Sequence, residues 1–120
     1  MKSALNWFEI FVHDLDRATR FYEQVLDDKL LRQDFMGTPN AIFPHDEAAP
    51  GGALVRMQGR EPGTGTLVYL PTEGKLDACI GRVAKAGGEV VQKKLAIGPA
   101  GFIAVIRDTE GNLVGLHSHS

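Results

Sequence analysis

The chain repeats one order of predicted elements, and this internal duplication constrains the fold more than any other feature. The sequence LDRA at residues 15–18 recurs as LDAC at residues 76–79, and each copy reads as a strand, a helix and three further strands. The 120-residue chain is therefore predicted to be a single α+β domain. We expect two tandem βαβββ modules, about residues 5–59 and 64–118, that form a cupped mixed sheet.

In the first copy, residues 7–12 form a predicted strand that is apolar on both faces except at Glu9. Asp14 is placed to cap a helix whose apolar residues recur at helical spacing. These residues are Leu15, Ala18, Phe21, Tyr22, Val25 and Leu26. Three short strands are predicted next, at residues 29–35, 40–43 and 52–58, with a turn at residues 37–39.

The second copy is predicted to follow the same order. Its first strand covers residues 65–70, and its helix covers residues 75–88, where a Gly-Gly pair ends it. Three further strands are predicted at residues 89–97, 101–108 and 112–118, and the last two are joined by a hairpin turn, DTEG.

The composition narrows the class of protein. With a net charge of −2, the chain has no basic stripe that would neutralise the phosphates of a nucleic acid. Its one cysteine, Cys79, excludes an intrachain disulfide and favours a reducing compartment. The longest uncharged stretch, residues 95–106, is too short to span a membrane. We therefore predict a cytoplasmic protein without a nucleic-acid or membrane partner.

The lone carboxylate in the first strand predicts an internal cleft. Phe8, Ile10 and Val12 form the face that the helix covers, so Glu9 lies on the other face with its neighbours Trp7 and Phe11. The same face of the second copy is predicted to carry Gly65, Leu67, Tyr69, Leu113, Gly115 and His117. If the two sheets curl around a shared space, Glu9 lies in a cleft instead of a dry core.

The residues HDLDRATRFYEQVLD after the first strand, the duplication and the closing DTEGNLVGLHS resemble the vicinal oxygen chelate superfamily. That group includes glyoxalase I, the bleomycin and fosfomycin resistance proteins, methylmalonyl-CoA epimerase and the extradiol dioxygenases. The resemblance spans essentially the whole chain. It implies a glyoxalase/bleomycin resistance-like fold, often completed as a homodimer, and a divalent metal held by His, Gln or Glu side chains in the enzymes of the family.

This sequence departs from the family at the metal positions. Carried over by the resemblance, these positions are Trp7, Gly65 or Thr66, Gly115, and Val55 or Arg56. Tryptophan, glycine and valine do not ligate a metal, and threonine and arginine are unsuitable. In this respect the sequence resembles the bleomycin resistance proteins, which bind their drug without a metal. The resemblance therefore implies that no cofactor is expected and that a divalent metal is possible only at a non-standard site.

The candidate catalytic residues are Glu9 and His117, which are predicted to face the same cleft. A desolvated Glu9 has a raised pKa and suits a general base or an anchor for a cationic ligand. The alternative is a structural carboxylate paired with Arg56 or a backbone donor, and an ordinary packing role for His117. The candidate ligand-binding residues are Trp7, Phe11, Arg56 and Tyr69, which offer an aromatic wall and an anion anchor.

Three functions remain open from the sequence. The first is a metal-independent, glyoxalase-like or bleomycin resistance-like protein that binds a small organic molecule in the cleft. The second is an enzyme, an isomerase or lyase (or a dioxygenase relative), that uses Glu9 and His117 directly or through a relocated metal. The third is a non-catalytic module whose cleft is filled by its own side chains and which acts through association.

Overall fold

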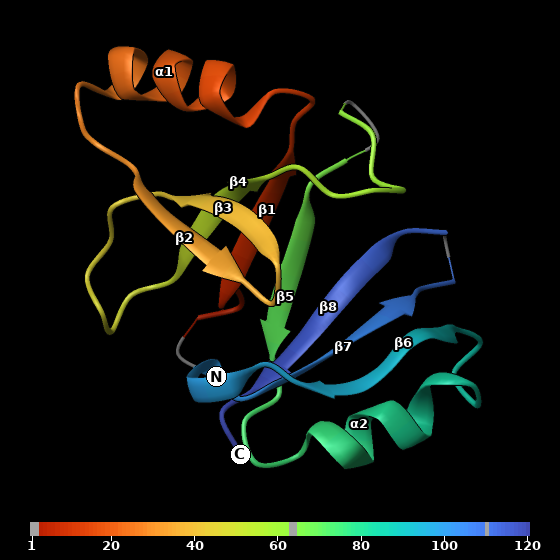
Figure 1. The fold of residues 1–120 in the computed structure, drawn as a ribbon. Helices are drawn as coiled ribbons and strands as arrows, with labels where there is room; N and C mark the ends of the chain where they lie inside the picture. The colour runs from red at the N-terminus through yellow and green to blue at the C-terminus, as the bar shows by residue number, and fades with distance from the viewer. Residues whose placement is uncertain (1–2, 63–64, 110) are drawn as a thin grey trace. The chain divides into compact units, whose positions relative to one another are not determined.

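The computed structural model describes residues 3–62, 65–109 and 111–120. Its contacts divide the chain into two compact units. The first unit is Trp7–Thr66, and the second is Leu67–Ser120 together with the segment that ends at Asn6. Each unit contains one βαβββ copy (Figure 1), which confirms the predicted α+β class. Among the described residues, no helix is both long enough and apolar enough to cross a membrane.

The first unit is a four-stranded sheet with one helix, and its strands lie in the order β2-β3-β4-β1. β1 runs parallel to β4, while β3 runs antiparallel to both of its neighbours. The elements are β1 (Trp7–Phe11), α1 (Leu15–Leu26), β2 (Leu31–Phe35), β3 (Thr38–Ile42) and β4 (Gly51–Val55).

Helix α1 covers one face of this sheet (Figure 1). Asp14 caps it as predicted, because its Oδ1 accepts a hydrogen bond from the Arg17 N–H at 3.0 Å. The core beneath the helix contains Leu15, Leu30, Ala41 and Leu54, with Ile10, Val12, Ala18, Tyr22 and Phe43 packed against it. The opposite face therefore carries Trp7, Glu9 and Phe11, and we call it the Glu9 face.

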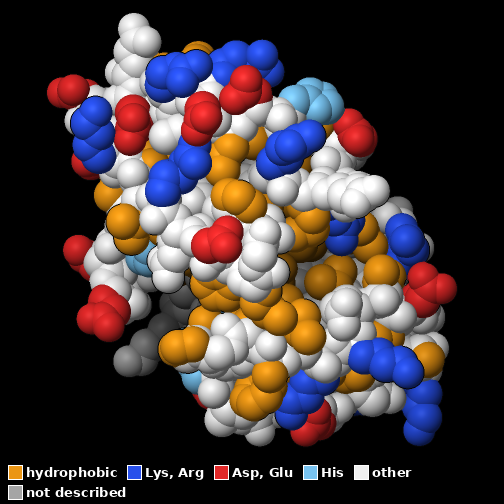
Figure 2. All heavy atoms as spheres, viewed as in Figure 1, with side chains coloured by type: hydrophobic (Ala, Val, Ile, Leu, Met, Phe, Trp, Pro, Cys, Tyr) orange, Lys and Arg blue, Asp and Glu red, His pale blue; other side chains and the backbone are white. Residues whose placement is uncertain are grey.

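The last turn of α1 differs from the prediction. Phe21, Val25 and Leu26 are 57%, 61% and 51% exposed, although their spacing placed them on the buried stripe. The helix contacts the core through its first two turns, so its last turn extends past the hydrophobic cluster. Figure 2 shows that acidic and basic side chains are interspersed over this helix.

The second unit repeats the arrangement, with its strands in the order β5-β8-β7-β6. β5 runs parallel to β8, and the other pairs are antiparallel. The elements are β5 (Leu67–Pro71), α2 (Leu76–Val83), β6 (Glu89–Ala96), a 3-10 turn (Gly98–Ala100), β7 (Phe102–Arg107) and β8 (Leu113–Ser118). Cys79 and Ile80 of α2 pack on a core of Leu76, Ala104 and Leu116. Because Leu116 faces the helix, Gly115 and His117 lie on the opposite face, as predicted.

Several boundaries differ from the predicted ones. Thr38 and Pro39 were predicted to lie in a turn but begin β3. Pro39 fits there because β3 pairs with β4 only from Asn40 onward, so the missing N–H costs no hydrogen bond to β4. Helix α2 ends at Val83, five residues before the predicted end, where the Gly88 N–H donates to the Val83 carbonyl at 3.0 Å. The Glu110 position of the predicted hairpin turn lies outside the described residues.

Candidate functional site

Glu9 lies in the middle of β1, where it is paired with Ala53 of β4. Among the described residues, its Oε1 atom has no hydrogen-bond partner, and it is closed off from solvent. Burial raises the pKa of the Glu9 carboxyl above its ordinary value of 4.5, although a hydrogen bond from the Trp7 side chain and the positive charge of Arg60 act in the opposite direction. Glu9 is therefore a carboxyl group that the fold biases toward its neutral, proton-donating form.

Arg60 is a functional candidate that the sequence did not indicate. Its guanidinium carbon lies 5.8 Å from the centre of the Phe11 ring, which is itself buried. The contact is a cation–π interaction, and it holds a positive charge at the end of β1 next to Glu9. The predicted anion anchor, Arg56, lies exposed immediately after the last residue of β4. Arg60 belongs to a loop, where strand alternation gives no information on side-chain direction.

His45 is the second candidate that sequence reasoning missed, because its segment was interpreted as a surface loop. Its ring occupies the place where a Cβ atom on Gly51 would lie, only 2.5 Å from the His45 Cε1 atom. Gly51 pairs with Trp7 across β4 and β1, so the ring lies on the Glu9 face. The centres of the His45 and Trp7 rings are 5.9 Å apart, in an edge-on arrangement.

The tautomer of His45 follows from its one hydrogen bond. Nδ1 lies 2.8 Å from the Phe43 carbonyl oxygen. Because a carbonyl oxygen only accepts, Nδ1 carries a proton and donates it. In the neutral ring, Nε2 is then left with a free lone pair, so it can accept a hydrogen bond or take a proton.

Three polar groups thus follow one another along the Glu9 face. His45 lies over the Trp7–Gly51 pair. The next pair on this face is Glu9–Ala53, and Arg60 lies over Phe11 of the pair after it. The three offer a hydrogen-bond acceptor, a carboxyl group and a cation on an aromatic surface. Such a set can bind a small polar molecule or move a proton on it.

His117 lies in the second unit, and both of its ring nitrogens have partners there. Nδ1 is 3.0 Å from the Asn6 Nδ2 atom, and Nε2 is 2.7 Å from the Ala100 carbonyl oxygen. The carbonyl can only accept, so Nε2–H donates to it and Nδ1 accepts from the Asn6 amide. Since His117 belongs to a different unit from Glu9, a Glu9–His117 pair stays a prediction.

The predicted aromatic residues divide between the two units. Trp7 and Phe11 share the Glu9 face, as expected, whereas Tyr69 belongs to the second unit. Tyr69 is buried, and its ring covers Gly115, where an added Cβ atom would lie 2.2 Å from the Tyr69 Cδ1 atom. Gly115 is therefore the residue that lets the Tyr69 ring lie flat on the sheet.

The family metal positions do not fit a metal. The Trp7 side chain is bound to Glu9, Val55 is a fully buried hydrophobic residue, and Gly115 lies under an aromatic ring. Gly65 and Thr66 precede β5, and Arg56 is exposed. Across residues 3–62, 65–109 and 111–120, no group of three or more His, Cys, Asp or Glu side chains is arranged to hold a metal ion.

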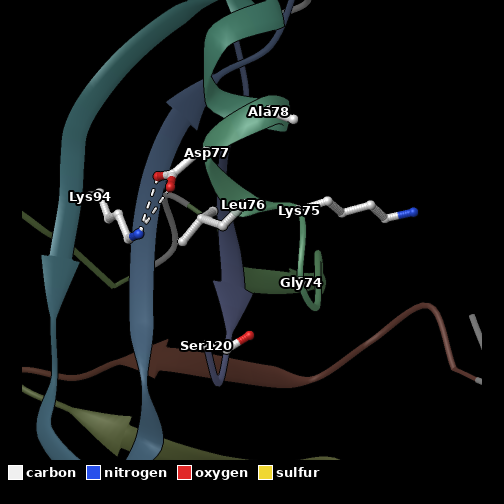
Figure 3. A pocket seen from close by; sticks show the side chains of 7 residues that line it. All are labelled: Gly74, Lys75, Leu76, Asp77, Ala78, Lys94 and Ser120. Atoms are coloured by element: carbon white, nitrogen blue, oxygen red, sulfur yellow. Dashed lines mark hydrogen bonds and ion pairs between the residues drawn. The ribbon is translucent and has the colours of Figure 1, made fainter.

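A cavity of about 450 Å³ lies in the second unit at the start of α2. Figure 3 shows that Lys94 faces Asp77, with which it forms an ion pair at 3.1 Å, and that Lys75 points away. The remaining lining residues are Gly74, Leu76, Ala78 and Ser120. With one lysine neutralised and the other directed outward, this cavity has no chemistry comparable to that of the Glu9 face.

Comparison with known proteins gives one family and many similar folds. The sequence profile described as the Glyoxalase/Bleomycin resistance protein/Dioxygenase superfamily matches residues 4–116. No curated protein sequence gives a significant match. The solved structure of a methylmalonyl-CoA epimerase from Mycobacterium tuberculosis is similar, with a TM-score of 0.71 and 20% identity, over 98% of this chain and 88% of that one.

Two further solved structures agree with it. A variant of the Streptomyces coelicolor methylmalonyl-CoA epimerase, in complex with 2-nitronate-propionyl-CoA, has a TM-score of 0.70 and 16% identity over 98% of both chains. A hypothetical protein from Bacillus halodurans C-125 has a TM-score of 0.71 and 17% identity over 97% of this chain and 94% of that one. At these identities, the likeness shows a shared fold alone.

Proposed function

The chain belongs to the Glyoxalase/Bleomycin resistance protein/Dioxygenase superfamily, and we propose that it binds a small organic molecule on the Glu9 face without a divalent metal at the usual family positions. The observation that carries this proposal is the buried Oε1 atom of Glu9, which lacks a hydrogen-bond partner among the described residues. Trp7 and Phe11 flank it, and the partly exposed Trp7 ring supplies an aromatic surface for an organic ligand, while Phe11 is buried beneath Arg60.

An unpartnered buried oxygen is costly to a fold. Leaving a polar group buried without a hydrogen bond costs about 1–3 kcal/mol, so such groups are retained where they serve a purpose. A bound molecule with a suitable polar atom would supply the missing partner of Glu9. The residue types at the metal positions support binding without a metal, because none of them offers a good ligand.

The second candidate is an enzyme that transfers a proton. The raised pKa of Glu9 favours it, because a carboxyl group that titrates closer to neutral pH is a better general acid or base. Two of the similar structures are epimerases by name. The second catalytic group in this candidate is His117, acting directly or through a relocated metal. The third candidate, an association module, would show no ligand response, and the expected homodimer fits all three.

The test is a ligand screen on chelator-treated protein, read as thermal stability with and without Ni²⁺, Zn²⁺, Mn²⁺ and Fe²⁺. Ligand binding to the native state raises the melting temperature by an amount set by its concentration relative to its Kd. We expect hits that stabilise the metal-free protein. Their affinity should fall at least about tenfold in Glu9→Leu, a loss of about 1.4 kcal/mol, because leucine can neither donate nor accept a hydrogen bond. The matched control Glu47→Leu, at an exposed loop position, should leave it unchanged.

Two results would contradict the proposal. Stabilisation that requires a particular metal, and that Glu9→Gln and His117→Ala both abolish, would favour the enzyme with a relocated metal. A screen without any hit would favour the association module. Proton transfer without a metal would instead appear as exchange of a ligand C–H with deuterated solvent, lost in Glu9→Gln.

A further inference from the structure

We propose that the Glu9 face selects organic anions, with the anionic group at Arg60, a flat middle over Glu9 and a hydrogen-bond donor at His45. This inference rests on the proposed function, because it names the ligand class of the same site. It also replaces His117 with His45 as the histidine that touches the ligand. All the residues involved belong to the first unit, Trp7–Thr66.

Arg60 sets the charge of the ligand. Its guanidinium lies over the Phe11 ring and makes no ion pair among the described residues, so its N–H donors remain available. A guanidinium presents a planar fork of donors that matches a carboxylate. The Phe11 ring beneath it fixes the position of the charge and excludes water from one side.

Burial raises the pKa of the Glu9 carboxyl, which weakens its opposition to an anion held at Arg60. A neutral carboxyl group donates a hydrogen bond, so Glu9 suits an acceptor such as a carbonyl or ether oxygen in the middle of the ligand. An approaching anion would favour the neutral form further, since it repels an ionised carboxylate. A cationic ligand would need an ionised Glu9 and would meet the positive charge of Arg60.

His45 determines which polar group the ligand carries at its other end. Its Nδ1–H is used by the Phe43 carbonyl, so the neutral ring presents only the Nε2 lone pair. A ligand group at this end must therefore donate a hydrogen bond, as a hydroxyl or an amide N–H does. Gly51 keeps the ring on the face, because any larger residue there would collide with it.

The spacing of the three groups fixes the length of the ligand. Residues two apart in a strand are separated by about 6.7 Å, so the positions of Trp7, Glu9 and Phe11 span about 13 Å in all. The partly exposed Trp7 ring lies along this span and suits a flat, conjugated middle. An aromatic acid that carries a hydroxyl at its far end has this length and both end groups, and a carbonyl or ether oxygen in its middle would add the partner of Glu9.

The test uses three probes that differ in one end group. 3-(4-Hydroxyphenyl)propanoate carries a carboxylate, 3-(4-hydroxyphenyl)propanamide is its neutral counterpart, and 4-hydroxyphenethylamine carries a cation. Trp7 is the only tryptophan of the chain and lies in the site, so its fluorescence reports binding directly. We expect the carboxylate to bind at least about tenfold more tightly than the amide, and the amine to bind most weakly.

Matched variants test each end. Arg60→Gln should remove the preference for the carboxylate over the amide, whereas Arg20→Gln, an exposed position on α1, should leave it intact. His45→Phe keeps a ring over Gly51 but lacks Nε2. It should lower the affinity for 3-(4-hydroxyphenyl)propanoate at least about fivefold. It should leave the affinity for 3-phenylpropanoate, which has no hydroxyl, unchanged. His13→Phe, at an exposed loop position, is the matched control.

The outcomes separate the two proposals. If the amine binds more tightly than the carboxylate, or if Arg60→Gln changes nothing, the anion inference is wrong while binding at the Glu9 face stands. If His117→Ala removes the effect of the hydroxyl and His45→Phe does not, the assignment of His45 is wrong. If no probe changes Trp7 fluorescence and the ligand screen is also empty, both proposals are wrong.

Discussion

The two units have the same topology but fill one equivalent position differently. Leu54 and Leu116 lie in the cores under α1 and α2, and they pair with Ile10 and Leu70, so Glu9 and Tyr69, each one residue earlier, occupy equivalent positions. Tyr69 is 7% exposed and carries a phenol ring, whereas Glu9 is a partly buried residue whose Oε1 atom is closed off from solvent. Since the second unit folds around a tyrosine at this position, the scaffold itself does not require a carboxyl group there.

The carboxylate that the second unit does use has the opposite surroundings. Glu73 is exposed and accepts hydrogen bonds from the His119 N–H at 2.8 Å, the His119 ring at 2.9 Å and the Ser120 hydroxyl at 3.1 Å. These bonds lower the pKa of Glu73 to about 2. Glu73 is thus a structural carboxylate that accepts hydrogen bonds from the residues just after β8. The Oε1 atom of Glu9, in contrast, has no hydrogen-bond partner among the described residues.

The histidines differ in the same way. Both ring nitrogens of His117 are engaged, by Asn6 and by Ala100, and the residue is partly buried. His45 has one engaged nitrogen and is exposed. His117, in the second unit, therefore has a structural role, whereas His45, in the first unit, has a ring nitrogen available to a ligand.

The largest expected effect comes from changing the two equivalent residues. Tyr69→Glu should destabilise the protein by about 4 kcal/mol, because it removes a buried ring that covers Gly115 and buries a carboxyl group. Glu9→Leu should stabilise it by about 1–2 kcal/mol, because it removes an unpartnered polar group. Urea unfolding at neutral pH measures both. A loss of stability in Glu9→Leu would mean that Glu9 is a structural partner.

The next effect distinguishes the two histidines. His117→Ala should cost about 2 kcal/mol, because it removes two hydrogen bonds and leaves the partly buried Asn6 amide and Ala100 carbonyl without these partners. His45→Phe should change the free energy of unfolding by less than about 0.5 kcal/mol, since the new ring still covers Gly51. Equal losses in the two variants would erase the distinction between a structural and an available histidine.

The elements and the faces of the strands could be predicted from the sequence. Alternation in β1 and the helical spacing after Asp14 placed Glu9 on the face opposite α1, and the phase of β8 placed His117 correctly in the same way. These predictions succeed because the alternation of side chains along a strand and the helical period are local properties of the backbone. The same reasoning failed for Val25 and Leu26, since periodicity does not say how far a sheet extends beneath its helix.

Arg60 and His45 could not be placed in this way because both lie in loops. The direction of a loop side chain depends on the path of the whole loop, and no period encodes it. One local signal was present for His45. Gly51 and Gly52 begin a buried strand, and a Cβ atom on either would collide with a ring, that of His45 or that of Phe8. Paired glycines within a strand indicate such close approaches.

The smallest expected effect is on the pH dependence of stability, where the two carboxyl groups act in opposite directions. For Glu73, whose folded pKa is about 2 and whose ordinary pKa is 4.5, the stabilisation is present above pH 4.5 and is lost as the pH falls toward 2. For Glu9, whose folded pKa is raised above 4.5, the contribution is full below pH 4.5 and is lost as the pH rises through the folded value.

Each variant should therefore reduce the change of melting temperature with pH on one side of about pH 4.5. Glu73→Gln should remove part of the rise between pH 2 and 4.5, and Glu9→Gln should remove a decline that begins above pH 4.5. Melting temperatures across this range, for the wild type and both variants, measure the two differences. If Glu9→Gln instead flattened the acidic side, Glu9 would be an ionised, paired carboxylate like Glu73. The two units would then use their carboxylates alike, and the anion inference would lose its neutral partner.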